Sequence, residues 1–248
     1  QSITIEDEEH RRLAASFIGP WLAQQSKLQL LRFYHTTWVT DELLQYWATN
    51  GLPPSLTSLM MTLCNITNDG LLMCAPLLAR LESLTALPAQ PVTNDVLHHL
   101  LDSPHFVTSM KRLALNCNNF SQPISTFFKN TAAMRSCSLI TLVIADYGEQ
   151  PDHLLSLASA LQANQINLQS LILFVQHGIT LRNVFISLAN NTTLKSLKTE
   201  YNSSLLTDEE VVNALVQNTS LRALELVHCF NDPENPNCFS WVPRNKHL

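Results

Sequence analysis

The chain has 248 residues, enough for a sizeable core, and carries a net charge of −5. Nucleic-acid-binding proteins normally have clustered Lys and Arg, so this balance argues against DNA or RNA as a partner. Only 5 residues are Gly, which argues against the Gly-rich loops that bind phosphates and hence against nucleotide cofactors.

The first segment, residues 1–27, contains the acidic run Glu6 to Glu9 in place of the basic start and apolar core of a signal peptide. Acidic residues stabilise the positive end of a helix, so we expect an N-terminal helical cap that begins near Glu6. No apolar run in the chain reaches the roughly 18 residues of a spanning helix, so we expect no membrane insertion. The six cysteines are scattered without close pairs, which favours reduced thiols and a cytoplasmic location.

From residue 28 onward the chain repeats itself. The segment from Leu56, LTSLMMTLCNIT, matches the pattern LxxLxLxx(N/C)xL at every anchor, and the segment from Met110, MKRLALNCNNF, matches it again. Looser copies start at Leu28, Leu81, Leu139, Leu168, Leu194 and Leu221. Successive starts are 28, 25, 29, 29, 29, 26 and 27 residues apart, which predicts about eight structural repeats.

Each repeat changes its periodicity halfway. The first half alternates with period two, which predicts a short parallel strand. The second half has helical spacing, and Thr207 with Glu210 three residues later predicts a capping box at the start of one helix. Thr40 and Thr93 are expected to open helices by the same side-chain chemistry.

These motifs resemble the ribonuclease-inhibitor-like class of leucine-rich repeat proteins. The resemblance implies an α/β horseshoe solenoid of strand-helix repeats of 25–29 residues, with a parallel sheet on the concave face and helices on the convex face. It covers residues 28–230, between the cap at 1–27 and a C-terminal cap or tail at 231–248 that contains three prolines.

The ninth position of each repeat normally holds Asn or Cys, whose side chain bonds the backbone of the neighbouring repeat. In this chain the position is occupied by Thr36, Cys64, Ala89, Asn118, Tyr147, Gln176, Asn202 and Cys229. Because Ala89 and Tyr147 depart from the rule, we expect the repeats that start at Leu81 and Leu139 to be distorted.

Residues with catalytic or metal-binding chemistry are few. His98 and His99 are neighbours on a predicted helix and so point about 100° apart, and no Cys or carboxylate stands at ligand spacing. Cys229 has only His228 beside it, and neighbours on a strand point to opposite faces. We therefore expect no catalytic residues, no metal and no cofactor.

The remaining candidate is a surface for another protein. Positions three, five, seven and eight of each repeat should face the concave side, with an apolar centre between charged and aromatic ends, which is typical of protein interfaces. The predicted protein-binding residues are Arg32, Tyr34, Met60, Leu87, Val143, Ile172, Phe174, Lys198, Glu200 and Tyr201. In particular, Val143, Ile172 and Phe174 are expected to form a contiguous exposed apolar patch.

The leading hypothesis is a non-enzymatic protein-interaction module. The irregular repeats and the Asn- and Thr-rich composition resemble the leucine-rich repeat effectors of intracellular bacterial pathogens, which implies secretion into a host cell without a classical signal peptide and a eukaryotic partner. Two alternatives stay open: a sensor or regulatory region of a larger cytosolic receptor, and an enzyme scaffold that uses the thiols or histidines.

Overall fold

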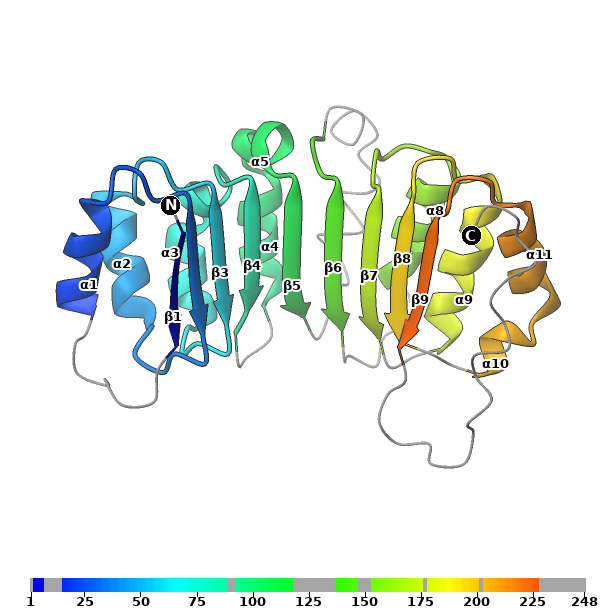
Figure 1. Ribbon diagram of the computed structural model, residues 1–248, viewed down its shortest axis with the longest axis horizontal. Coiled ribbons are helices and arrows are strands. Elements are labelled where there is room, and N and C mark those ends of the chain that lie inside the picture. Colours follow the sequence, from blue (N-terminus) through cyan, green and yellow to red (C-terminus); the bar gives the residue numbers. More distant parts are fainter. Residues whose placement is uncertain are drawn as a thin grey trace. The chain divides into compact units, whose positions relative to one another are not determined.

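The computed structural model describes residues 2–6, 15–88, 92–117, 137–146, 153–175, 178–200 and 203–227. The chain divides into two compact units, unit 1 (residues 1–118) and unit 2 (residues 119–248). In both units parallel strands alternate with helices, and the helices lie on one face of the sheet (Figure 1).

Unit 1 contains five strands that pair in chain order, each parallel to the next. The strands are β1 (Ser2–Glu6), β2 (Leu30–Tyr34), β3 (Ser58–Thr62), β4 (Ser83–Leu87) and β5 (Arg112–Cys117). The helices are α1 (Ala15–Ala23), α2 (Asp41–Asn50), α3 (Asn68–Leu78), α4 (Asn94–Leu101) and α5 (Pro104–Ser109).

Unit 2 repeats the arrangement with four described strands, again parallel and in chain order. They are β6 (Thr141–Asp146), β7 (Ser170–Val175), β8 (Ser196–Glu200) and β9 (Ala223–Val227). The helical segments are α8 (His153–Gln162), α9 (Gly178–Ser187), the 3₁₀ turn η1 (Leu188–Asn190), α10 (Ser203–Leu206) and α11 (Glu209–Gln217).

The strands confirm the predicted repeat register. Every one of the eight predicted starts is followed two residues later by the first residue of a strand. All eight starting residues are buried, from 0% exposed at Leu28 to 8% at Leu56. The register is also regular after Leu81 and Leu139, where we expected distortion, because β4 and β6 begin two residues on as well.

A backbone hydrogen-bond pattern explains why the spacing tolerates 25 to 29 residues. At the start of β3, the N–H groups of Thr57 and Ser58 both donate to the carbonyl of Gln29 in the preceding repeat, at 3.0 and 2.9 Å. In unit 2, Lys195 and Ser196 donate in the same way to Gln169, at 2.8 and 2.9 Å. The strand starts are therefore pinned together while the helical half of the repeat varies in length.

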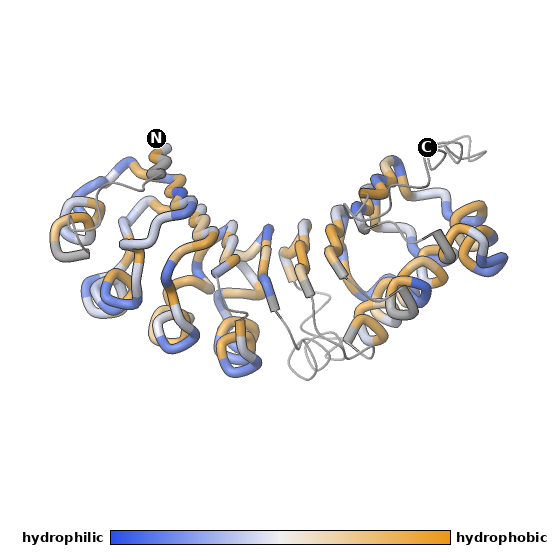
Figure 2. Tube along the Cα trace, turned by 90° about the horizontal axis from the view of Figure 1, so that it is seen from below, coloured by the Kyte–Doolittle hydropathy of each residue, from blue (hydrophilic) through white to orange (hydrophobic). Residues whose placement is uncertain are grey.

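The core lies between the sheet and its helices. In each unit hydrophobic residues gather on the inner side of the strands and helices (Figure 2). In unit 1, the fully buried Phe33 of β2 packs edge-on against Trp38, with ring centroids 5.6 Å apart, and lies 6.3 Å from the ring of Trp47 on α2. This burial supplies most of the favourable free energy of folding.

The N-terminal segment differs from the expected helical cap. Residues 2–6 form a strand that pairs with β2, with Ser2 opposite Leu30, and α1 from Ala15 is the first helix among the described residues. Ile3 and Ile5 alternate with polar residues, a period of two that favours a strand over a helix. The start of the segment is therefore a strand, and the helix expected after Glu6 falls on residues 7–14, which lie outside the described part of the chain.

The N-caps of the helices differ from the predicted capping bonds. The N-cap of α11 is Asp208, whose carboxylate accepts the N–H groups of Glu210 and Val211, so the capping residue lies one position after Thr207. Thr40 and Thr93 occupy N-cap positions as expected, but their side chains make no capping hydrogen bond in the structure.

In unit 1 the first residues of two helices bond to the next repeat. Asp41, the first residue of α2, accepts the N–H of Thr67 at 2.8 Å and its hydroxyl at 2.6 Å. Asn68, the first residue of α3, accepts the N–H of Thr93 at 2.8 Å. These side chains connect the helix N-termini of successive repeats.

The ninth repeat position is described in two repeats. There, Thr36 and Cys64 are buried, and the Thr36 hydroxyl and the Cys64 sulfur form a hydrogen bond of 3.1 Å between neighbouring repeats. This is the inter-repeat role that the pattern predicts. The other six predicted residues lie outside the described part of the chain: Ala89, Asn118, Tyr147, Gln176, Asn202 and Cys229.

Unit 2 has an inter-repeat device that the sequence analysis missed. Asn218, 1% exposed, donates to the carbonyls of Leu188 and Asn191 at 2.6 and 2.9 Å. Its Oδ1 accepts the N–H groups of Ser220 and Leu221 at 3.0 and 2.7 Å. Asn191 makes equivalent bonds one repeat earlier. The visible signal was an Asn three residues before each of the two starts at 194 and 221.

Candidate functional site

In each unit one face of the sheet carries none of the described helices, and we call it the open face (Figure 1). Side chains at positions three, five and seven of each repeat point to it, since those at positions four and six form the core. In unit 1 the register places Arg32, Met60 and Thr85 side by side, and Tyr34, Thr62 and Leu87 in a second row. Neighbouring strands of a sheet lie about 4.8 Å apart, so each row is continuous.

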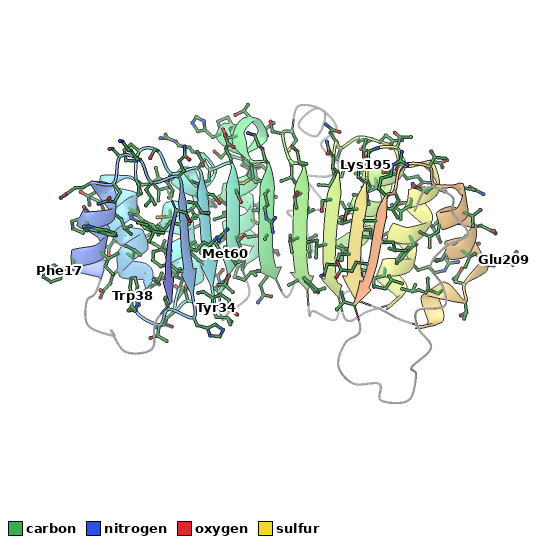
Figure 3. The ribbon with its side chains drawn as sticks, viewed as in Figure 1. Phe17, Tyr34, Trp38, Met60, Lys195 and Glu209 are labelled. Carbon is green, nitrogen blue, oxygen red and sulfur yellow. The ribbon has the colours of Figure 1, made fainter. Side chains whose placement is uncertain are left out.

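The predicted binding residues of unit 1 lie on this open face: Figure 3 labels Tyr34 and Met60, and the strand register places Arg32 and Leu87 in the same rows. Tyr34 is 45% exposed and Arg32 is exposed, while Met60 and Leu87 are half-buried. The structure therefore brings together an exposed guanidinium, a phenol and two flexible apolar side chains. Such a mixture suits contact with another protein more than it suits chemistry on a small molecule.

The residue after the strand adds to this surface. His35 and Leu63 follow β2 and β3, and both have a φ of 53°, the left-handed region that few non-glycine residues adopt. Their N–H groups donate to the carbonyls of Thr62 and Leu87 in the next repeat, at 3.0 and 2.8 Å, which fixes the conformation. Leu63 is held 43% exposed as a result. Leu63 stands at position eight of its repeat, one of the positions expected to face the concave side, but the sequence analysis did not include it among the binding residues.

Two side-chain oxygens on the open face of unit 1 lack partners. Oγ1 of Thr62 and Oδ1 of Asn116 are buried and accept or donate no hydrogen bond within the described residues. Both residues stand at position seven of their repeats, and Thr62 as a whole is 9% exposed. Buried polar groups are normally paired, so these two oxygens mark a place where the free protein leaves bonding capacity unused.

In unit 2 the predicted apolar patch is smaller than expected. Val143, Ile172 and Lys198 stand in register on β6, β7 and β8. Ile172 and Phe174 are half-buried and keep part of their surface, but Val143 is only 7% exposed, so its place in an exposed patch was wrong. The register sets Val143 beside the larger Ile172 of β7.

The charged part of the unit 2 face is paired. Nζ of Lys198 lies 2.6 Å from Oε1 of Glu225 on the next strand. Glu200 is the last residue of β8, and Tyr201 lies outside the described residues. The side chains of β7 point to the predicted faces, since Leu171 and Leu173 are 0% exposed on the core side.

The thiols and histidines are not arranged for chemistry in the described residues. Burial raises the pKa of the Cys64 and Cys137 thiols and raises that of Cys74 to about 11, so the reactive thiolate is disfavoured at all three. They are free cysteines, as predicted. His99 Nδ1 contacts the carbonyl of Asp95 at 2.9 Å.

The metal and membrane searches cover the same residues. Across the described ranges, no group of three or more His, Cys, Asp or Glu side chains is placed to hold a metal ion. None of the helices in those ranges combines the length and apolar character needed to cross a bilayer. Cys117, Cys229 and His228 have no described side chains, so the expectation that they take no part in catalysis stays a prediction.

The alternation of strand and helix, the parallel pairing in chain order and the buried leucine anchors define an α/β solenoid of the leucine-rich repeat type. Neither protein-family models nor curated protein sequences give a match to the chain. Among solved structures, a chain of the yeast Rad7–Elc1 complex is similar, with 15% sequence identity over 86% of this chain and a TM-score of 0.44. The present chain spans 66% of the length of that one.

Proposed function

We propose that the protein is a non-enzymatic interaction module that binds another protein through the open faces of its sheets. A solenoid sheet is already ordered before binding, so association costs little conformational entropy. The strands also hold the contact residues on a rigid frame, at spacings set by the sheet.

The observation that supports this most is the pair Tyr34 and Leu63, which are 45% and 43% exposed on the open face of unit 1. Tyr is enriched at the centres of protein interfaces. The left-handed backbone at Leu63 is unfavourable for a leucine, yet it keeps a large apolar side chain in solvent. A partner that covers both side chains removes this apolar surface from water.

Unit 2 contributes a second contact surface in this proposal. Ile172 and Phe174 supply the apolar part, and Lys198 with Glu225 supplies a charged pair beside it. Glu200 and Tyr201 are proposed as neighbours of this surface from their place in the repeat. Val143 is no longer included, because its side chain is buried.

The test compares sheet-face variants with matched helix-face variants. Partners are first captured by the wild-type protein and identified, and their affinities are then measured by titration. Tyr34→Ala combined with Leu63→Asn should weaken binding by tenfold or more, since central aromatic anchors often carry about 2 kcal/mol. Asn tolerates the left-handed backbone, so folding is kept.

The control is Met73→Ala combined with Leu155→Ala, which removes side chains that are 44% and 41% exposed on helices α3 and α8. It should bind as tightly as wild type. Loss of binding in this control, with retention in the sheet-face variant, would move the site to the helical side of the repeats and defeat the proposal.

The finer proposal is that the chain is a bacterial effector that acts on a host protein in the cytoplasm. It is supported by two features of the sequence, the irregular repeats and the many Asn and Thr residues. If it holds, an identified partner is a eukaryotic protein and binds the wild type but not the sheet-face variant. A partner encoded in the same genome as this chain would overturn it.

A further inference from the structure

We infer, building on the proposed function, that the open face of unit 1 binds an extended acidic segment of the partner. The segment would carry an apolar or aromatic side chain next to its carboxylates. Three features of the face support this assignment: its charge, its unpaired oxygens and its exposed apolar edge.

The charge of the face is positive although the whole chain has a net charge of −5. Strands β2 to β5 contain no Asp or Glu, whereas Arg32 and Arg112 lie on their open face and are exposed. His35 stands at the end of β2. Guanidinium groups bind carboxylates with two parallel hydrogen bonds, so acidic side chains are the complementary partner groups.

Most of the described acidic residues of unit 1 lie off the strands. Glu42, Asp69 and Asp95 are in the first turns of helices α2, α3 and α4. Glu82 is paired with Lys111, at 2.8 Å. On the strands, Glu6 ends β1 at the edge of the sheet, in register with Tyr34. The two arginines therefore have no carboxylate on the strands between them.

The two unpaired oxygens can accept hydrogen bonds from backbone N–H groups of a partner. Thr62 Oγ1 and Asn116 Oδ1 are buried without hydrogen bonds among the described residues. They stand two strands apart, a separation of about 10 Å in a sheet. Three residues of a chain in the extended polyproline II conformation rise about 9 Å and complete one turn, so N–H groups three residues apart point to the same side and can be directed at both oxygens. A folded helix presents no free backbone N–H groups along its length and does not satisfy them.

The apolar edge accepts a side chain from the same segment. Tyr34 and His35 contact each other edge-on, with ring centroids 4.6 Å apart, and the exposed Leu63 follows on the next repeat. An aromatic residue of the partner can pack on these groups while neighbouring carboxylates reach Arg32. The combination selects an acidic segment with an aromatic residue over a purely acidic one.

The probes are two fluorescent random copolymers, one of Glu and Tyr and one of Lys and Tyr. Fluorescence anisotropy at low salt should show that the Glu/Tyr copolymer binds at least tenfold more tightly, although the net charge of −5 opposes it. Arg32→Ala with Arg112→Ala should reduce this binding at least tenfold. The matched control, Arg80→Ala with Arg222→Ala, removes two exposed arginines outside this face and should leave it unchanged.

A second variant separates binding from folding. Thr62→Val keeps the shape of the side chain and removes its unpaired hydroxyl. It should keep or raise the melting temperature, because a buried group without a partner is lost, and yet weaken copolymer binding several-fold. A purely structural hydroxyl would not lower affinity in a variant of unchanged or increased stability.

Equal binding of both copolymers, or undiminished binding by the double arginine variant, would overturn the inference. The proposed function is judged separately by the identified partners and the Tyr34/Leu63 variant. If those partners need Tyr34 and Leu63 but bind the double arginine variant normally, the sheet-face function holds and the acidic segment is wrong. If they need neither pair, both proposals fail.

Discussion

The two units share a repeat but connect successive repeats through different side chains. In unit 1 Thr36 meets Cys64 after the strands, Asp41 and Asn68 reach the next helix start, and before β3 the hydroxyls of Ser55 and Thr57 donate to backbone carbonyls of the preceding repeat. In unit 2 the buried amides of Asn191 and Asn218 make the bonds before the strands, and the ion pair of Arg182 with Asp208 links two helices. The backbone bonds at the strand starts are the same in both.

Different side chains can therefore connect neighbouring repeats, whereas the backbone hydrogen bonds between strands are the same in both units. At the position of Asn218, three residues before the repeat start, unit 1 has Gln25, Pro53, Leu78 and Val107. The stacking of repeats therefore does not depend on one consensus residue. Removing a connecting side chain should nevertheless cost more stability in unit 2 than in unit 1, because Asn218 is buried whereas the bonds of Asp41 to Thr67 are exposed.

The largest expected effect comes from reversing a side chain across the sheet. Leu171→Glu places a carboxylate at a position that is 0% exposed, and the desolvation of that charge should unfold unit 2. Ile172→Glu, one residue further on the open face, should change stability by about 1 kcal/mol or less. Hydrogen exchange followed separately in the two units would detect the loss. Equal tolerance of both substitutions would show that the strand register is misassigned.

The second largest effect compares the loss of stability when a connecting asparagine is removed from each unit. Asn218→Ala leaves the buried N–H groups of Ser220 and Leu221 without their acceptor and removes one of the donors to each of two carbonyls, so we expect a loss of about 3 kcal/mol in unfolding free energy. Asn68→Ala in unit 1 removes the exposed bond to the N–H of Thr93 and should cost less, about 1 kcal/mol. Urea unfolding of both variants gives the comparison. A larger loss for Asn68→Ala would reverse it.

A third change strains the connection in unit 1. A Cβ added at Gly70 would come within 2.2 Å of Asp41 Oδ1, so Gly70→Ala must displace the carboxylate from Thr67. We expect a loss of about 1 to 2 kcal/mol. In an Asp41→Ala background the same change should cost much less, and a double-mutant cycle measures this coupling. Additive effects would mean that Gly70 is sensitive for another reason.

The smallest effect concerns an exposed ion pair in unit 2. Arg182 Nε lies 2.6 Å from Asp208 Oδ2, and this hydrogen bond holds the pKa of Asp208 below its usual range. A lowered folded-state pKa contributes stability that is present above about pH 4 and is lost as the pH falls through the folded value. Asp208→Asn keeps an N-capping side chain and removes the charge.

The measurement for that pair is the melting temperature of both proteins as a function of pH. The wild type should be slightly more stable at pH 7, and the difference should disappear as the pH is lowered below 4. High salt should also reduce it at pH 7. A difference that stays constant from pH 7 to pH 3 would show that Asp208 acts only through its capping bonds.

The repeat, the positions of β2 to β9 and most of the core could be predicted from the sequence. Leucines at fixed offsets can be buried together only if each repeat places them on the same side, so eight repeat starts predicted eight strands. The alternation in β7 likewise separated Leu171 from Ile172. These properties depend on which residues are apolar and how far apart they stand, and both are written in the chain.

The exposure of the open-face side chains and the bonds between repeats became known from the folded molecule alone. Val143 stands beside Ile172 and is buried, whereas Leu63 is exposed on a left-handed backbone whose N–H donates to a carbonyl of the following repeat. Asp41 and Asn218 find partners 26 to 30 residues away. Such outcomes depend on pairs of residues from different repeats, and no local pattern specifies which pairs will meet.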